Sequence, residues 1–180
     1  MAVQTRRYTV DEFDRMAQLP ENAERRLEYI GGEIVSVVSN SYSSEVAANI
    51  LIAVGAYVKS QKLGRVTGAD GGYQIVNERY IPDVAFISQA RQPEPSHEAY
   101  NSHSPDLAVE VLSPTDDPRL IRLKIAHYLA AGTVVWLVNT EEKHIEVYTP
   151  GQPPKMAYET LDGGAVLPVF SMAVKDIFPD

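Results

Sequence analysis

The sequence predicts one α/β domain, a mixed β-sheet with helices packed against it. Three observations support this prediction. Apolar residues recur every four positions between residues 43 and 63, which is typical of a long helix with one buried face. Short apolar runs at 84–87, 107–112 and 134–138 are typical of strands. Helix-capping residues separate the second run from the third, so strands and helices alternate.

The composition limits the class of protein. The chain has 180 residues, 44% hydrophobic and 22% charged, as expected of one soluble domain spanning 1–180. It has no cysteine, which excludes disulfides and thiolate metal sites and favours a cytoplasmic location. Residues 1–10 lack the apolar core of a signal peptide, and no apolar run is long enough to span a membrane. The net charge of −8 argues against a broad electrostatic grip on nucleic acid, although a bound divalent ion and a local basic stripe can act despite it.

The N-terminal part predicts a short helix and a hairpin. A Thr-Val-Asp-Glu capping box opens a helix over 9–17. Residues 27–30 and 33–38 read as the two arms of a β-hairpin. Gly31 and Gly32 form its turn, because glycine tolerates the positive φ that such turns require.

A long helix follows, capped by Ser43 or Ser44, running to about Leu63 and ended by Gly64. Its apolar stripe is expected to face the core. The stripe consists of Val46, Ile50, Val54 and Val58, with Ala47 and Leu51 alongside.

The middle of the chain predicts further strands and a long connection. Strands are expected at 65–67, at 73–76 and up to Ile87, with a turn at 77–79. The glycines within 68–72 lack the spacing of a nucleotide-binding loop and indicate a turn. Residues 88–105 are polar and contain several prolines, and connections of this length tend to be functional or mobile.

The C-terminal half predicts a strand, a helix and two more strands. The helix is capped by Asp116 or Asp117, has Pro118 at its first position and ends at Gly132. The strands are expected at 107–112, 134–138 and 145–148. Residues 150–180 indicate one or two weak strands and irregular structure.

Asp83 and Glu110 are the most informative pair of residues. Asp83 opens the strand 84–87, and Glu110 lies inside the apolar strand 107–112, where an unpaired charge is costly. If the two strands are neighbours, spaced about 4.8 Å apart, these two side chains can converge on one divalent cation. Asp106 lies about 13 Å from Glu110 along the same strand, too far to share an ion, and is interpreted as a turn or strand-start residue.

Lys124 is the candidate basic residue. It lies on the helix after the Glu110 strand, beside the apolar residues that face the sheet. Its ammonium could therefore reach the strand ends and hold a water or a phosphate oxygen. An ordinary solvated helix lysine is an equal alternative.

The remaining polar candidates receive plainer interpretations. The segment 113–115 is interpreted as a strand-to-helix turn rather than a phosphate-contacting loop. Trp136 lies in an apolar run and is interpreted as a core residue. Four histidines show no zinc-site spacing and are interpreted as surface or helix-face residues: His97, His103, His127 and His144.

The order of these motifs resembles a known superfamily. Pro82-Asp83, then Glu110-Val-Leu-Ser-Pro114, then Lys124-x-x-x-Tyr128-x-x-x-Gly132-x-x-x-x-Trp136-x-Val138 is similar to the PD-(D/E)XK nucleases. More narrowly, it resembles a bacterial restriction-endonuclease family, whose opening hairpin is similar to Leu27-Glu28-Tyr-Ile-Gly31-Gly-Glu33-Ile-Val35. The resemblance extends over about residues 8–178.

The resemblance implies a restriction-endonuclease-like core that binds Mg²⁺ or Mn²⁺. It implies Asp83 and Glu110 as metal ligands, with the backbone carbonyl of Val111 as a third. Glu28 matches the family's N-terminal acid, near the metal. The alternative for Glu28 is a hairpin glutamate in a solvated row with Glu33.

The basic residue departs from the superfamily pattern. The usual lysine stands two residues after the acidic ligand, where this chain has Leu112. In the narrower family the lysine lies on the following helix, and Lys124 matches that place. The resemblance therefore implies a catalytic role for Lys124.

Three functional hypotheses follow. The first is a Mg²⁺-dependent endonuclease that hydrolyses DNA, working as a homodimer, as nucleases that cut both strands often do. The second is a nuclease-fold nucleic-acid-binding or assembly module with weak or no catalysis, suggested by the acidic composition and the displaced lysine. The third is a small-molecule binder in which residues 88–105 act as a lid.

Overall fold

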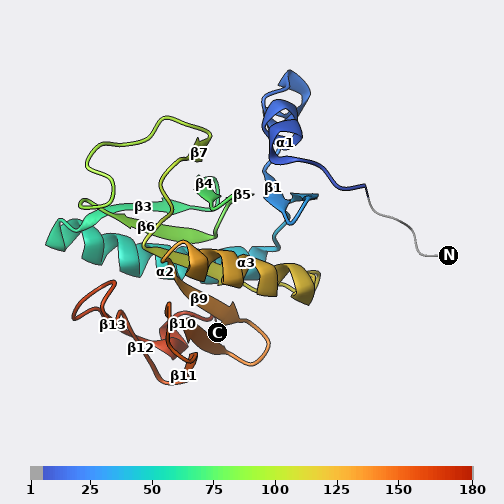
Figure 1. Ribbon diagram of the computed structural model, residues 1–180. Coiled ribbons are helices and arrows are strands. Elements are labelled where there is room, and N and C mark those ends of the chain that lie inside the picture. The colour runs from blue at the N-terminus through green and yellow to red at the C-terminus, as the bar shows by residue number, and fades with distance from the viewer. Residues whose placement is uncertain (1–5, 180) are drawn as a thin grey trace.

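The computed structural model describes residues 6–179 and is built around a six-stranded mixed sheet (Figure 1). The strand order is β11-β10-β9-β8-β6-β3. These strands are β3 (Gly64–Gly68), β6 (Val84–Ser88), β8 (Leu107–Val111), β9 (Val134–Asn139), β10 (His144–Tyr148) and β11 (Lys155–Ala157). Strands β8 and β9 run parallel and the other pairs antiparallel, which confirms the predicted mixed sheet.

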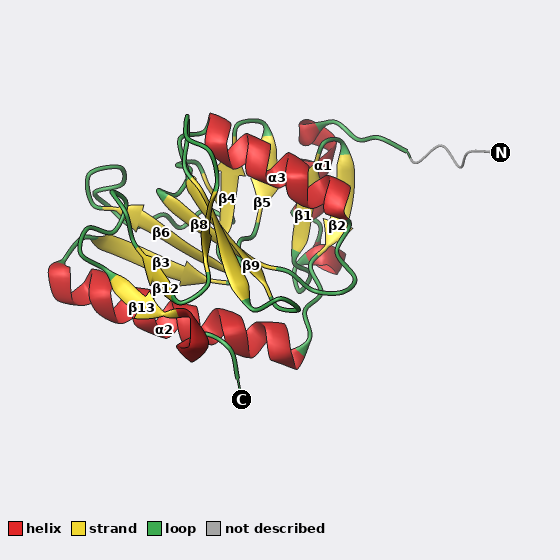
Figure 2. Cartoon of the chain, turned by 90° about the horizontal axis from the view of Figure 1, so that it is seen from below, coloured by secondary structure: helices red, strands yellow, loops and turns green. Residues whose placement is uncertain are grey.

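Two helices, α2 (Ser41–Gln61) and α3 (Pro118–Ala130), lie on opposite sides of this sheet, as Figure 2 shows. Successive residues of β8 confirm the arrangement. Val109 packs into the core that contains the α2 stripe, and Ala108 packs into the core that contains Ile125 of α3. Because both faces of the sheet are covered, its strands read as continuous apolar runs rather than as alternating ones.

A second sheet, which the sequence did not predict, lies beside the first. Its five strands are ordered β2-β1-β5-β4-β7. They are β1 (Leu27–Ile30), β2 (Glu33–Ser36), β4 (Gly72–Ile75), β5 (Glu78–Tyr80) and β7 (Tyr100–Asn101). The hairpin of β1 and β2 confirms the predicted one. The prediction of a turn at 77–79 is wrong, because Ile75 pairs with Glu78 and Val76 takes φ 57, so only Val76 and Asn77 form the turn.

The ends of α2 differ from the prediction. Asn40 caps the helix, not Ser43 or Ser44, because its side-chain oxygen accepts a 2.9 Å hydrogen bond from the Ser43 amide. Lys62 ends the helix in the left-handed conformation (φ 55), where the prediction placed the stop at Gly64. The apolar stripe is confirmed, since each of its four members is at most 2% exposed.

The other helix boundaries are confirmed. The Thr9 capping box opens α1 (Val10–Ala17), and Asp117 caps α3 with Pro118 in its first turn. The C-terminal segment forms a small ribbon of β12 (Thr160–Asp162) and β13 (Ser171–Ala173). Short 3-10 helices occupy Pro20–Asn22 and Val174–Asp176. Within the described residues, no helix has both the length and the hydrophobicity needed to cross a bilayer.

Candidate metal centre

The register of two strands brings Asp83 and Glu110 together. Val84 pairs with Val109 and Ala85 pairs with Ala108, so Asp83 stands opposite Glu110 at the end of this antiparallel ladder. Paired residues share a face of the sheet, and this face is the one that α3 covers. The Asp83 carboxylate is also fixed from β8, since its Oδ2 accepts a 2.7 Å hydrogen bond from the Val111 amide.

Lys124 joins the site from α3. Its ammonium donates to Glu110 Oε2 at 2.7 Å and to both carboxylate oxygens of Glu28, at 3.0 and 3.2 Å. Both Lys124 and Glu28 are 5% exposed. The solvated alternatives for these two residues are therefore wrong. Their catalytic roles stay predictions.

Tyr128 is a member of the site that sequence reasoning did not assign. Its hydroxyl donates to Glu110 Oε1 at 2.7 Å, and the residue is fully buried. Its position four residues after Lys124, on the same helix face, is the signal that could have identified it. The Ile81 amide fixes Glu28 in a similar way, by donating to Oε1 at 2.6 Å. Each acidic side chain of the site thus has a defined orientation.

The site carries more negative than positive charge. Three carboxylates, those of Glu28, Asp83 and Glu110, meet one ammonium. Burial raises the pKa of Glu110 to about 8, since the neighbouring acids add to the effect and Lys124 only partly offsets it. Burial also raises the pKa of Asp83. Burial lowers the pKa of Lys124, but the two glutamates outweigh that effect and raise it above the ordinary value, so this lysine stays protonated.

A cavity of about 480 Å³ opens onto these side chains. Two segments contribute much of its lining: residues 35–39, at the end of β2 and directly after it, and residues 113–117 before α3. The second segment is a turn, as predicted, because Asp116 accepts a 2.7 Å hydrogen bond from the Ser113 amide. The space between these two segments thus gives access to the carboxylates.

The residues fit a hard divalent cation by their chemistry. Within residues 6–179, no group of three or more histidine or acidic side chains is already arranged as a cation cage. Mg²⁺ does not require one, since it is commonly held by one or two carboxylates and keeps several waters. Asp83 and Glu110 supply two such carboxylates on one face, and the excess of negative charge favours a cation there. The Val111 carbonyl stays a predicted third ligand.

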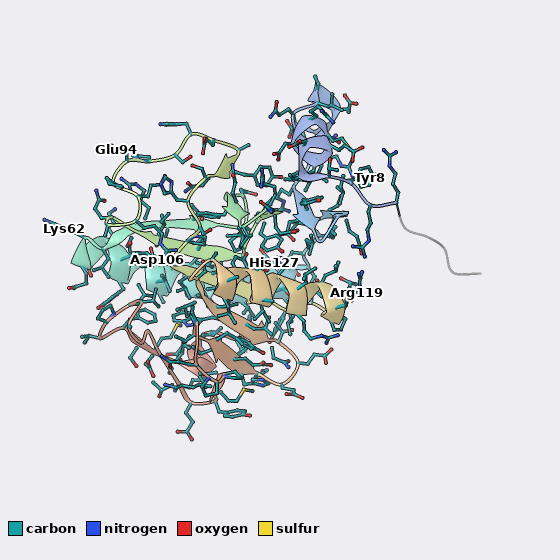
Figure 3. All side chains as sticks on the ribbon, in the orientation of Figure 1. Tyr8, Lys62, Glu94, Asp106, Arg119 and His127 are labelled. Carbon is teal, nitrogen blue, oxygen red and sulfur yellow. The ribbon has the colours of Figure 1, made fainter. Side chains whose placement is uncertain are left out.

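Other candidate residues lie outside the site. Asp106 forms an ion pair with Arg91 at 3.2 Å and accepts from the Ser88 amide, which agrees with a structural role at a strand start (Figure 3). His127, on α3, contacts the Tyr80 hydroxyl through Nδ1 at 2.6 Å.

Two predictions about aromatic residues have different outcomes. Trp136 is fully buried, which confirms it as a core residue. The interpretation of His144 as a surface residue is wrong, because it begins β10, packs against the ring of Tyr158 and is 3% exposed.

Comparison with known proteins identifies the family. The model of the family described as "Uma2: Putative restriction endonuclease" matches residues 10–175. The chain belongs to this family. No curated protein matches it. A crystal structure of "a putative nuclease belonging to DUF820" from Anabaena variabilis ATCC 29413 superposes with a TM-score of 0.82 at 24% identity, covering 95% of this chain and 97% of that chain. The predicted restriction-endonuclease-like α/β fold of this Uma2 family member is confirmed.

Proposed function

We propose that this protein is a Mg²⁺- or Mn²⁺-dependent nuclease that hydrolyses phosphodiester bonds in DNA. The observation that supports this most directly is the convergence of Asp83 and Glu110 on one covered face of the sheet, with a protonated lysine between Glu110 and Glu28. Membership in a family described as restriction endonucleases agrees with it.

The proposal assigns a task to each residue of the site. Asp83 and Glu110 would hold the metal. When bound, the metal would acidify an attacking water and stabilise negative charge on the phosphate. Lys124 would add a second positive charge beside the phosphate, and its raised pKa keeps that charge at neutral pH. Glu28 holds Lys124 in place through two hydrogen bonds.

The decisive experiment removes one carboxylate without changing its shape. Asp83→Asn and Glu110→Gln should each abolish divalent-dependent cleavage of plasmid DNA. Calorimetric titration of the same proteins with Mn²⁺ should show weaker binding than in the unmodified protein. Thermal unfolding would establish that both variants are folded.

Asp106→Asn is the matched control. Like Asp83, this residue follows a proline and borders a strand of the same sheet, but it pairs with Arg91 outside the site. Its cleavage and Mn²⁺ affinity should equal those of the unmodified protein. An Asp83→Asn protein that cuts as fast as the unmodified protein would refute the assignment.

One observation favours the second candidate, a binding or assembly module of nuclease fold. The Lys124 ammonium contacts two carboxylates, and these contacts must loosen before it can face a phosphate. Purified protein that binds Mn²⁺ and DNA duplexes but leaves them intact would support this second candidate over a nuclease.

A further inference from the structure

A second, smaller hollow adjoins the metal centre on the side where α2 begins. Its volume is about 280 Å³. It shares Val37, Ser39 and Asp83 with the larger cavity, so the two spaces adjoin each other at these residues. A ligand in the hollow would therefore lie directly beside the proposed metal.

Hydrogen-bond donors dominate the polar lining of this hollow. The donors come from Arg26, Ser39, Asn40, Ser41 and Ser44, and Asp83 supplies the one carboxylate of the lining. Within residues 6–179, no hydrogen bond engages the hydroxyl of Ser41 or of Ser44. Such a donor set with a guanidinium suits an anion with several oxygen atoms.

The Arg26 guanidinium can turn toward such an anion at little cost. Its present contacts are long, 3.4 Å to the Ala69 carbonyl and 3.4 Å to Asp70, whose side chain is 91% exposed. Exposed ion pairs of this kind contribute little and exchange readily. A partly buried phosphate would compete with them successfully because Arg binds phosphate through two parallel hydrogen bonds.

The opposite rim of the larger cavity has the contrary charge. It carries Asp116 and Asp117, of which Asp117 is paired with Arg119 at 3.3 Å, and the chain as a whole has a net charge of −8. A polyanionic strand is repelled at that rim and attracted at the Arg26 hollow. These charges favour the side of the Arg26 hollow for the approach of a nucleic acid.

We propose that the Arg26 hollow binds a phosphate group of the nucleic-acid strand, next to the phosphodiester that is hydrolysed at Asp83 and Glu110. This proposal rests on the proposed function, because it names a subsite of the same centre. It assigns Arg26, Ser41 and Ser44 as binding residues.

The first test measures DNA binding by the Arg26→Gln variant. Fluorescence anisotropy with a labelled duplex in Ca²⁺, at several KCl concentrations, gives the affinity and its salt dependence, with the duplex checked for integrity on a gel. Loss of one phosphate contact should lower the magnitude of the slope of log K against log salt by about 1. Arg25→Gln is the matched control, since Arg25 binds Asn22 and Ser36 and does not line the hollow.

A second variant separates binding from folding. Ser41 is the first residue of α2, where an acidic side chain interacts favourably with the helix. Ser41→Asp should therefore leave the thermal midpoint unchanged or raise it, while its charge weakens duplex binding by roughly tenfold, as expected for like charges placed together. If Ser41 had a purely structural role, the Ser41→Asp substitution would lower thermal stability and duplex binding together.

The outcomes distinguish this subsite from the nuclease proposal. Arg26→Gln and Ser41→Asp proteins that bind duplex with unmodified affinity and salt slope would overturn the subsite, even if Asp83→Asn abolishes cleavage. Loss of duplex binding in these variants, with Mn²⁺ affinity unchanged, would support the subsite even in a protein that never cuts. If inorganic phosphate binds in an Arg26-dependent manner while duplex binding is insensitive to Arg26, the hollow holds free phosphate and the strand assignment is wrong.

Discussion

Helix α3 forms two ion-pair contacts with the same hairpin, and the two differ in burial. Lys124 pairs with Glu28 of β1, where both side chains are 6% exposed. Arg119 lies at the start of the helix (Figure 3). It pairs with Glu33 of β2, and the exposures of the two side chains are 55% and 20%. Both contacts join α3 to one hairpin through a basic and an acidic side chain. They differ in burial, and Lys124 also pairs with Glu110.

The hairpin register explains why one acid is buried and the other is not. Glu28 pairs with Val35 and Ile30 pairs with Glu33, so both acids point to one face of the hairpin. Glu33 adjoins the Gly31–Gly32 turn at the edge, whereas Glu28 lies farther in, under α3. Burying an ion pair costs more than hydrophobic packing would, so the inner pair is better explained by function than by stability.

The largest effect is expected from Lys124→Met. The substitution leaves Glu28 and Glu110 buried without their cation, and breaking a buried pair in this way costs about 3–5 kcal/mol. Urea unfolding at pH 8 in EDTA measures the loss. Lys124→Arg keeps the charge, so its free energy of unfolding should fall much less. A loss for Lys124→Met no greater than that for Arg119→Met would show that burial does not separate the two contacts.

The buried contact should also make stability depend on pH in the metal-free protein. The pKa of Glu110 is raised from 4.5 to about 8 in the folded state. Between these values the folded state holds a proton that the unfolded state has released, so stability falls as pH rises from about 5 to 8. Thermal unfolding across this range in EDTA measures the slope.

Glu110→Gln is the control for this pH dependence, since it cannot ionise and should flatten the curve. Glu33, outside the buried site, should make no comparable contribution, because the Arg119 hydrogen bond lowers its pKa. A metal-free protein whose stability rises from pH 5 to 8 would contradict the proposed charge state of Glu110.

A smaller effect is expected from Tyr128→Phe. The variant removes only the hydroxyl that donates to Glu110 Oε1, and below the raised pKa of Glu110, where this side chain is uncharged, a hydrogen bond contributes about 0.5–1.5 kcal/mol. If Tyr128 also positions the carboxylate, Mn²⁺ affinity measured by calorimetry should fall as well. Tyr80→Phe is the matched control, because that hydroxyl contacts His127 and no proposed metal ligand. Equal Mn²⁺ affinities in the two variants would leave Tyr128 with a structural role alone.

The buried contact also shows what the sequence could and could not predict. Strand type and the α2 stripe follow from local apolar periodicity and were predictable. The Asp83–Glu110 pairing required in addition that their two strands be neighbours, and the second sheet was not predicted because periodicity does not say which strands pair. The position of Lys124 depends on how α3 lies across β1 and β8. Helical spacing alone cannot distinguish a Lys124 side chain that is buried at the site from one that points into solvent. The hydrogen bond from Tyr128 to Glu110 likewise depends on how α3 lies across the strands. The hollow at Arg26 joins the residue before β1, the segment before α2, the first turns of α2 and the loop after β3, which no local pattern connects.

The smallest effect is expected from Arg119→Met, at the exposed contact. The Arg119 side chain is more than half exposed, so water replaces most of what the carboxylate of Glu33 provides, and the thermal midpoint should not change measurably. The pKa of Glu33, now lowered mainly by its hydrogen bond with Arg119, should nevertheless rise toward its ordinary value, which an NMR titration would detect. A fall in midpoint as large as that of Tyr128→Phe would mean that the outer contact also holds α3 against the hairpin, and that function alone does not explain the inner pair.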